Sequence, residues 1–298
     1  MEVNDLYDII KNVRRIEYQT NQFVDSIFYG AYKSVFKGRG IEFSEVREYR
    51  TGDDIRSIDW NVTARMGSLY VKEFVEERDL NLVIAFDISG SLEFGTQKNF
   101  KKDVAVEMAA SLCFSAMRNN DRVGLVLFTS EVEKYIPPSK GREHNLRIIR
   151  EMLYYTPKKR GTNIGNSLHF IGRVLKKRGI VFLISDFDEE IKNYSKDLKI
   201  LRKKHDVIAV RIRDIREKEI PNVGFIELED CETGEQILID TSDEEFRKNY
   251  LKLVEEHEQE INNFFKRNNV DLIEISTDGG WVKPLINFFK KREQRLKR

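Results

Sequence analysis

Cysteine and long apolar runs are scarce in this chain of 298 residues. Its two cysteines, Cys113 and Cys231, lie far apart and in no metal-type spacing, which argues against a disulfide framework. The longest apolar runs are far too short to cross a bilayer, and the first residues lack the basic and apolar regions of a secretory signal. We therefore expect a cytoplasmic protein, with a peripheral position on the inner face of the membrane as the alternative.

An excess of charge of either sign is also missing. Lysine plus arginine number 51 and aspartate plus glutamate 50, so no global field attracts the chain to nucleic acid or to an anionic membrane. The sequence contains no phosphate-binding loop, dinucleotide fingerprint, nucleophile elbow or zinc-binding histidine pair. These absences favour a protein that is not an enzyme.

Apolar strands alternate with helical patterns from residue 80 onward. Buried strands are predicted at 82–87, 122–128, 180–184, 207–212 and 270–275. This alternation predicts an α/β fold with a doubly wound, mostly parallel central sheet flanked by helices. We expect this domain to span 80–298, with a hairpin insertion near 222–241.

The region before residue 80 is predicted to be a small α+β extension over 1–79. Apolar residues at helical spacing within the first 36 residues indicate one or two amphipathic helices. Short strands and turns follow up to about residue 77. In the main domain, a strand at 132–136 is expected to stop at Pro137 and Pro138.

Polar side chains gather at three predicted junctions of the central sheet. Asp87, Ser89 and Ser91 end or follow the strand at 82–87, Thr162 precedes a helix, and Asp186 follows the strand at 180–184. Because the carboxyl ends of parallel strands share one edge, these side chains can surround a single point. Oxygen ligands select hard cations, so we expect Mg²⁺ there, with Mn²⁺ or Ca²⁺ as alternatives. Taken alone, the first motif could also be a helix cap with neighbouring serines.

This pattern resembles the metal-ion-dependent adhesion site of von Willebrand factor type A domains, in which D-x-S-x-S is followed by a threonine and then an aspartate. The resemblance implies that Ser89, Ser91 and Thr162 supply hydroxyl ligands, and that Asp87 and Asp186 bind the ion directly or through water. It also implies one open coordination position that accepts a carboxylate from a partner protein. The implied function is metal-dependent protein–protein interaction.

A second motif occupies residues 38–65, where acids, arginines and aromatic residues alternate too regularly for a linker. Its G-D-D-x-R-x-I-D-W block at 52–60 resembles the signature of the bacterial domain of unknown function 58 family, in which this block precedes a type A domain. Members of that family are linked with MoxR-type AAA+ ATPases and other type A domain proteins. The resemblance therefore implies an accessory or assembly role beside such an ATPase.

The charges of this second motif favour a structural ion-pair network over a recognition surface. Bidentate pairs between arginines and acids would fix the segment, and the tryptophan is expected to be a packing anchor. The residues concerned are Arg47, Arg50, Asp53, Asp54, Arg56, Asp59, Trp60 and Arg65.

Two other functions stay open at this point. A metal-dependent phosphohydrolase would use an ion held by Asp87 and Asp186, although Ser89 stands where dehalogenase-type phosphatases have a second acid. The final helix ends in a basic cluster at 290–298 that would suit an anionic membrane or nucleic acid. Basic residues at a helix C-terminus are, however, expected from the macrodipole alone.

Overall fold

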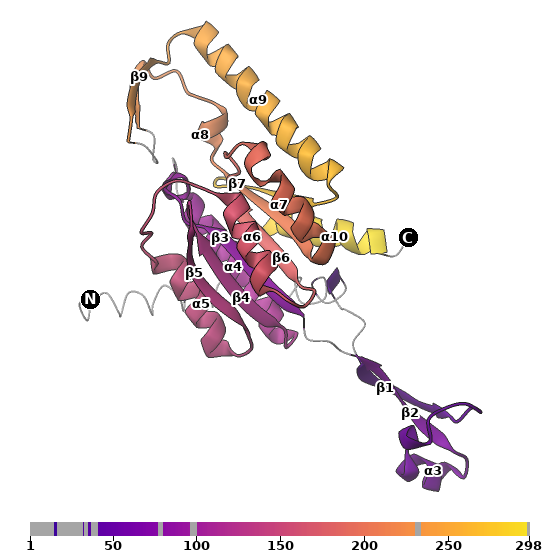
Figure 1. Cartoon of the computed structure of the whole chain (residues 1–298). Helices are drawn as coiled ribbons and strands as arrows, with labels where there is room; N and C mark the ends of the chain where they lie inside the picture. The colour runs from indigo at the N-terminus through magenta and orange to yellow at the C-terminus, as the bar shows by residue number, and fades with distance from the viewer. Residues whose placement is uncertain are drawn as a thin grey trace. The chain divides into compact units, whose positions relative to one another are not determined.

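The computed structural model describes residues 15–16, 32, 35–36, 41–76, 80–95, 100–229 and 234–296. These residues divide into two compact units (Figure 1). The smaller unit lies within 36–80, and the larger unit begins at 81 and includes the described residues before 36. The helices predicted within the first 36 residues fall outside the described residues, apart from five positions. Cys231 and the last two residues of the basic cluster also fall outside them.

The smaller unit is a two-stranded antiparallel sheet with two short helical segments between its strands. Its elements are β1 (Ile41–Glu48), η2 (Ile55–Ser57), α3 (Trp60–Met66) and β2 (Tyr70–Glu76). The helix α3 ends at Gly67, whose φ of 76° is a left-handed conformation that glycine adopts without strain. This turn returns the chain to β2.

The larger unit contains a six-stranded sheet in the spatial order β10-β7-β6-β3-β4-β5. Its strands are β3 (Asn81–Asp87), β4 (Arg122–Phe128), β5 (Val132–Ser139), β6 (Ile180–Ser185), β7 (Asp206–Arg213) and β10 (Asp271–Ser276). All neighbours are parallel except β4 and β5. The predicted doubly wound, mostly parallel α/β fold is therefore confirmed. The strand order reverses at β3 and β6, so their carboxyl ends form the switch point where such sheets bind ligands.

Helices cover both faces of this sheet (Figure 1). One face carries α6 (Ile164–Val174), α7 (Ile191–Lys204) and α9 (Glu244–Arg267), and the other carries α4 (Lys101–Arg118), α5 (Arg142–Tyr154) and α10 (Val282–Leu296). Because both faces are covered, every position of β6 is buried. None of the described helices is long and apolar enough to cross a membrane.

The strand β5 continues through Pro137 and Pro138, so the expectation that it would stop there was wrong. It is the edge strand of the sheet, where a residue without an N–H leaves no ladder partner unsatisfied. Gly124 on the neighbouring strand makes room for the prolines, because a Cβ there would lie 2.9 Å from Cγ of Pro138.

A short helix and a hairpin follow β7. The short helix α8 (Ile215–Lys218) leads to an antiparallel hairpin of β8 (Phe225–Glu229) and β9 (Gln236–Asp240). In this hairpin Ile226 faces Ile239 and Leu228 faces Ile237. Directly opposed residues share a face, so one side of the hairpin is apolar.

Candidate metal-binding site

Asp87 is the last residue of β3 and is completely buried. Its Oδ1 accepts a hydrogen bond from the backbone N–H of Ser89 at 2.9 Å, and its Oδ2 accepts one from Oγ of Ser185 at 2.7 Å. The hydroxyl oxygens of Ser89 and Ser91 lie 3.0 Å apart. The first motif is therefore one connected set of oxygens at the end of β3. Ser89 precedes η3 (Gly90–Glu93) but its side chain makes no capping hydrogen bond, which disfavours the helix-cap interpretation.

Asp186 directly follows β6 and is only 3% exposed. Its Oδ2 accepts a hydrogen bond from Nζ of Lys101 at 3.0 Å, and its backbone carbonyl accepts one from Nε of Arg211 at 3.0 Å. The next residue, Phe187, has a left-handed φ of 59° that turns the chain sharply. Asp186 is thus held at both its side chain and its backbone.

Thr162 lies two residues before α6, and the neighbouring backbone is anchored on both sides. The N–H of Asn163 donates to the carbonyl of Thr129, just after β4, at 3.0 Å. The N–H of Ile164 donates to Oε2 of Glu189 at 2.7 Å, which ties the start of α6 to the loop after β6. These bonds hold the Thr162 loop at the carboxyl edge of the sheet.

The loops that carry these residues line one cavity of about 820 Å³. Ser91, Thr162 and Asp186, from three separate junctions, all line it, while Asp87 and Ser89 are buried behind them. The structure therefore places the five sequence-predicted residues at one edge, and their role as metal ligands stays a prediction. The lining also includes apolar residues from the segment after α8 and from β8: Ile220, Pro221, Val223, Ile226 and Leu228.

The electrostatics of the site reflect two buried carboxylates close together. Burial raises the pKa of Asp87 to about 7, and the negative charge of Asp186 adds to the rise, although hydrogen bonds from Ser185 and Ser89 oppose it. Among the described residues, the groups that donate to Asp87 are neutral. A pair of carboxylates that repel each other beside hydroxyl oxygens is a donor set that fits a hard divalent cation.

The described residues contain no group of three or more histidine, cysteine, aspartate or glutamate side chains that could hold a metal ion. A site built from Asp87, Asp186 and three hydroxyl residues is therefore poor in charge. Few charged ligands give low intrinsic affinity, in the range of roughly 10⁻⁵ to 10⁻³ M for calcium sites of this kind.

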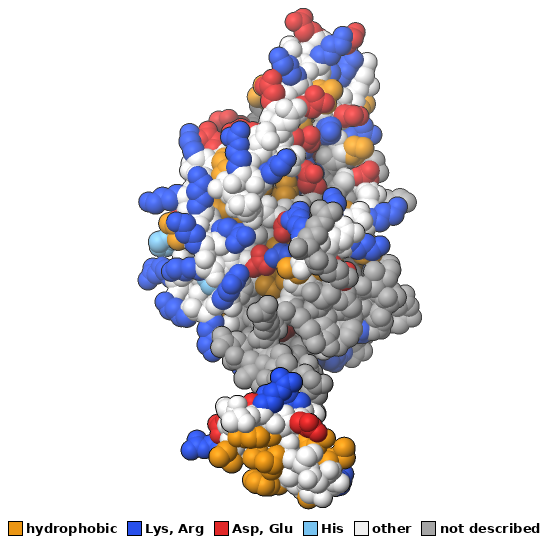
Figure 2. All heavy atoms as spheres, turned by 90° about the vertical axis from the view of Figure 1, so that its right-hand side faces the viewer, with side chains coloured by type: hydrophobic (Ala, Val, Ile, Leu, Met, Phe, Trp, Pro, Cys, Tyr) orange, Lys and Arg blue, Asp and Glu red, His pale blue; other side chains and the backbone are white. Residues whose placement is uncertain are grey.

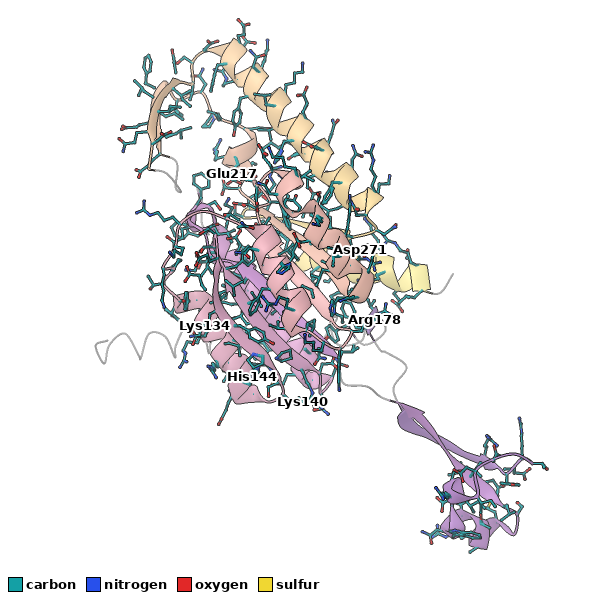
Figure 3. All side chains as sticks on the ribbon, in the orientation of Figure 1. Lys134, Lys140, His144, Arg178, Glu217 and Asp271 are labelled. Carbon is teal, nitrogen blue, oxygen red and sulfur yellow. The ribbon has the colours of Figure 1, made fainter. Side chains whose placement is uncertain are left out.

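Lys101, the first residue of α4, is the main site residue that sequence reasoning missed. Its side chain is 1% exposed, and its ammonium also contacts Oε1 of Glu217 on α8. Glu217 is labelled in Figure 3. Burial pulls the pKa of Lys101 down, but the carboxylates of Asp186 and Glu217 raise it above its ordinary value, so the ammonium stays charged. A signal was available, because a lysine at a helix N-terminus opposes the macrodipole.

Within the described part of the smaller unit, the predicted ion-pair network includes a bidentate pair between Arg47 and Asp53. Nη1 and Nη2 of Arg47 donate to the two carboxylate oxygens of Asp53 at 2.7 and 2.8 Å, and these bonds lower the pKa of Asp53 to about 2. Asp54 and Asp59 instead accept backbone hydrogen bonds as N-caps of η2 and α3. In the described structure, Arg50, Arg56 and Arg65 form no ion pair with these acids.

Trp60 is 64% exposed, so it does not anchor the packing within the smaller unit. It is the first residue of the seven-residue helix α3, which has no buried residue. Other apolar side chains of the smaller unit are also exposed, and hydrophobic atoms gather on the face of this unit seen in Figure 2. The exposed set comprises Ile55, Trp60, Met66 and Leu69.

The basic cluster of α10 is partly neutralised. Arg292 forms ion pairs with Asp206 and Asp271, and Arg295 forms one with Asp271. These pairs lie at the amino ends of β7 and β10, at the opposite edge of the sheet from Asp186. They reduce the positive charge available for an anionic membrane or nucleic acid.

Sequence comparison places most of the chain in one family. A family model described as "Protein of unknown function DUF58" matches residues 45–260. The chain is also similar to the uncharacterized protein Rv1480 of Mycobacterium tuberculosis, with 29% identity over 287 residues that cover 95% of this chain and 89% of the relative.

Comparison with solved structures found similarities to three proteins, of which the first supports the fold. An aerotolerance-related membrane protein from Bacteroides fragilis is 15% identical, covers 72% of this chain and 99% of its own, and has a TM-score of 0.50. A von Willebrand factor type A protein from Catenulispora acidiphila is 14% identical over 47% of this chain and 34% of its own, with a TM-score of 0.37. Proximal thread matrix protein 1 from the mussel byssus, solved with a zinc-occupied metal-ion-dependent adhesion site, is 20% identical over 45% of this chain and 38% of its own, with a TM-score of 0.37.

Proposed function

The chain belongs to the family Protein of unknown function DUF58, and we propose that its larger unit is a metal-dependent protein-interaction module. The observation that carries the proposal is the meeting of Ser91, Thr162 and Asp186, from three separate junctions, at the wall of one cavity. Asp87 and Ser89 join this set through hydrogen bonds behind the wall. Carboxylate and hydroxyl oxygens in this arrangement suit Mg²⁺, or alternatively Mn²⁺ or Ca²⁺.

Each residue has a distinct part in the proposed site. Ser89, Ser91 and Thr162 offer hydroxyl oxygens, and Asp87 and Asp186 offer the charge, directly or through water. A bound divalent ion would supply a Lewis-acidic position for one carboxylate of a partner protein. Ser185 and the backbone N–H of Ser89 keep the carboxylate of Asp87 oriented, since each bonds a different oxygen of it.

The apolar lining of the cavity adds a preference for the residues around that carboxylate. Ile226 and Leu228 line the cavity and belong to the apolar face of the β8–β9 hairpin. Leu228 is 42% and Ile237 61% exposed, so this face is available for contact. The partner we propose therefore offers an acidic side chain beside apolar ones.

The family resemblance supports a more specific partner. We propose that the chain is an accessory or assembly factor for a MoxR-type AAA+ ATPase, or for another type A domain protein. This proposal assigns no reaction to the chain itself.

Ion binding is the first test. Isothermal titration of the purified chain with MgCl₂ or MnCl₂ is expected to give weak, single-site binding that is lost in Thr162→Ala. The matched control is Thr156→Ala, because Thr156 is exposed and does not line the cavity. Equal ion binding by both threonine variants would exclude the proposed site.

Partner capture is the second test. The immobilised chain is mixed with the MoxR-type ATPase of the same organism in Mg²⁺, in EDTA, and with Thr162→Ala as bait. We expect retention in Mg²⁺ that disappears under both other conditions. Retention that EDTA does not change would mean that the ATPase binds outside the proposed metal site, and the metal-dependent mechanism would be wrong for that partner.

A further inference from the structure

The buried ammonium of Lys101 forms an ion pair with Asp186, one of the two acids of the proposed site. Nζ of Lys101 is 3.0 Å from Oδ2 of Asp186, and its side chain is 1% exposed. Burying a lysine is costly unless its charge is paired, and Lys101 is paired twice, with Asp186 and with Glu217. The ammonium is therefore the counter-ion that the chain itself supplies at this edge of the sheet.

Other cations near Asp186 do not share this role. Arg211 donates to the backbone carbonyl of Asp186, and the acid that its guanidinium approaches, at 3.9 Å, is Asp188. Lys102, the next residue along α4, pairs at 3.6 Å with Glu93. Within the described part of the chain, Lys101 forms the ion pair with the carboxylate of Asp186.

We propose that Lys101 is a tethered competitor for the carboxylate of Asp186, and that it sets how tightly the site binds a divalent cation. This inference rests on the proposed function. Lys101 contacts an oxygen of Asp186, an acid assigned to the ion, and two cations beside one carboxylate repel each other. When the site is loaded, Lys101 gives up Asp186 and keeps its second partner, Glu217.

Glu217 is well placed to receive the ammonium. Its Oε1 contacts Lys101, while its Oε2 accepts the N–H of Asp214 in the capping box of α8. Its backbone carbonyl accepts a hydrogen bond from the hydroxyl of Tyr250 at 2.6 Å. Glu217 is thus fixed on its own element, and it lines the same cavity as Asp186.

The competition makes two predictions of opposite sign. Lys101→Met removes the competitor, so affinity for Mg²⁺ or Mn²⁺ is expected to rise by about tenfold or more. Glu217→Gln removes the second partner and leaves Lys101 bound to Asp186 alone, so affinity is expected to fall by about tenfold. A purely structural role for Lys101 would instead lower affinity when Lys101 is removed.

A double-mutant cycle separates competition from the general effect of charge. In the Lys101→Met background, Glu217→Gln is expected to change affinity less than about twofold, because the ammonium that links the two residues is gone. An equal effect of Glu217→Gln in both backgrounds would show direct through-space attraction and overturn the proposal. Lys102→Met is the matched control, since it removes the same charge one residue away and is expected to leave affinity unchanged.

Isothermal titration with MnCl₂ and the shift of the unfolding temperature with Mn²⁺ measure these effects without any partner. If wild type binds the ion and Lys101→Met binds equally or more weakly, the Lys101 proposal is wrong while the proposed site stands. If neither binds the ion, both proposals are wrong. Should Lys101→Met fail to fold, Glu217→Gln retains the buried ammonium, and unchanged or stronger binding in that variant overturns the proposal.

Discussion

Replacing Asp87 with asparagine is expected to stabilise the ion-free protein while removing its response to divalent ions. Asp87 is completely buried, and burial together with Asp186 raises its pKa from 3.8 to about 7. An acid with a raised pKa destabilises the fold when it is ionised. Asparagine has nearly the same shape, keeps an acceptor for the N–H of Ser89 and carries no charge.

The magnitude follows from the pKa values of the folded and unfolded states. One pKa unit corresponds to about 1.4 kcal/mol, so ionised Asp87 costs up to roughly 4 kcal/mol at pH 8. The folded state binds the proton more tightly than the unfolded state, so this cost is absent below about pH 4, grows as the pH rises toward 7 and is then constant. At pH 5 it is roughly 2 kcal/mol.

The hydrogen bond from Ser185 to the ionised carboxylate is already included in the pKa of about 7, so neutral asparagine is compared with neutral Asp87. We therefore expect Asp87→Asn to raise the free energy of unfolding by up to roughly 4 kcal/mol at pH 8 and by roughly 2 kcal/mol at pH 5. Urea denaturation in EDTA, followed by circular dichroism at both pH values, measures this difference.

The control for this experiment is Asp103→Asn, because Asp103 is exposed in the first turn of α4. It is expected to show no stabilisation that grows with pH. The reasoning about Asp87 would be refuted if Asp87→Asn were less stable than wild type at pH 8, or if its gain were the same at pH 5. In the same samples, excess Mg²⁺ should raise the unfolding temperature of wild type but not of Asp87→Asn.

Three further predictions concern the smaller unit, the edge of the central sheet and catalysis. Asp53→Asn should destabilise the smaller unit, because it removes the bidentate pair with Arg47. Bonding to Arg47 holds the pKa of Asp53 near 2, so wild type should lose the same stabilisation as the pH falls from about 4 to 2. Hydrogen exchange of the backbone amides of residues 46–53 measures both losses of stability. Gly124→Ala should lower stability by about 1–3 kcal/mol in thermal denaturation, because its Cβ would meet Pro138 at 2.9 Å. Generic phosphoesters with Mg²⁺ or Mn²⁺ should be hydrolysed no faster by wild type than by Asp87→Ala; a clear excess in wild type would favour the phosphohydrolase alternative.

The fold of the larger unit could be predicted because its signals are local. The strand at 82–87 is an apolar run up to Phe86 that ends in Asp87, and all six positions are buried. The extent of β5 could not be predicted, since Pro137 stops an inner strand but not an edge strand, and strand order is a tertiary property. The exposure of Trp60 could not be predicted from the sequence either, because burial depends on how large a core the neighbouring elements form.

The site was only half visible in the sequence. Residues such as Asp87 and Asp186 follow apolar strands, so a rule about the ends of parallel strands is enough to bring them together. Lys101 and Glu217 carry no such pattern, since 116 residues separate them and each belongs to a different helix. Only the tertiary structure, which brings the start of α4 to Asp186 after β6 and to Glu217 on α8, shows that an ammonium lies between two carboxylates.

This internal ammonium changes what a divalent ion is needed for. Structural metal sites fold only when the metal neutralises their ligands. Here Lys101 neutralises Asp186, and a pKa of about 7 lets Asp87 bind a proton near neutral pH, so the ion-free edge is compensated by the chain itself. In the proposed site, removal of a bound ion should therefore weaken partner binding and leave the fold intact.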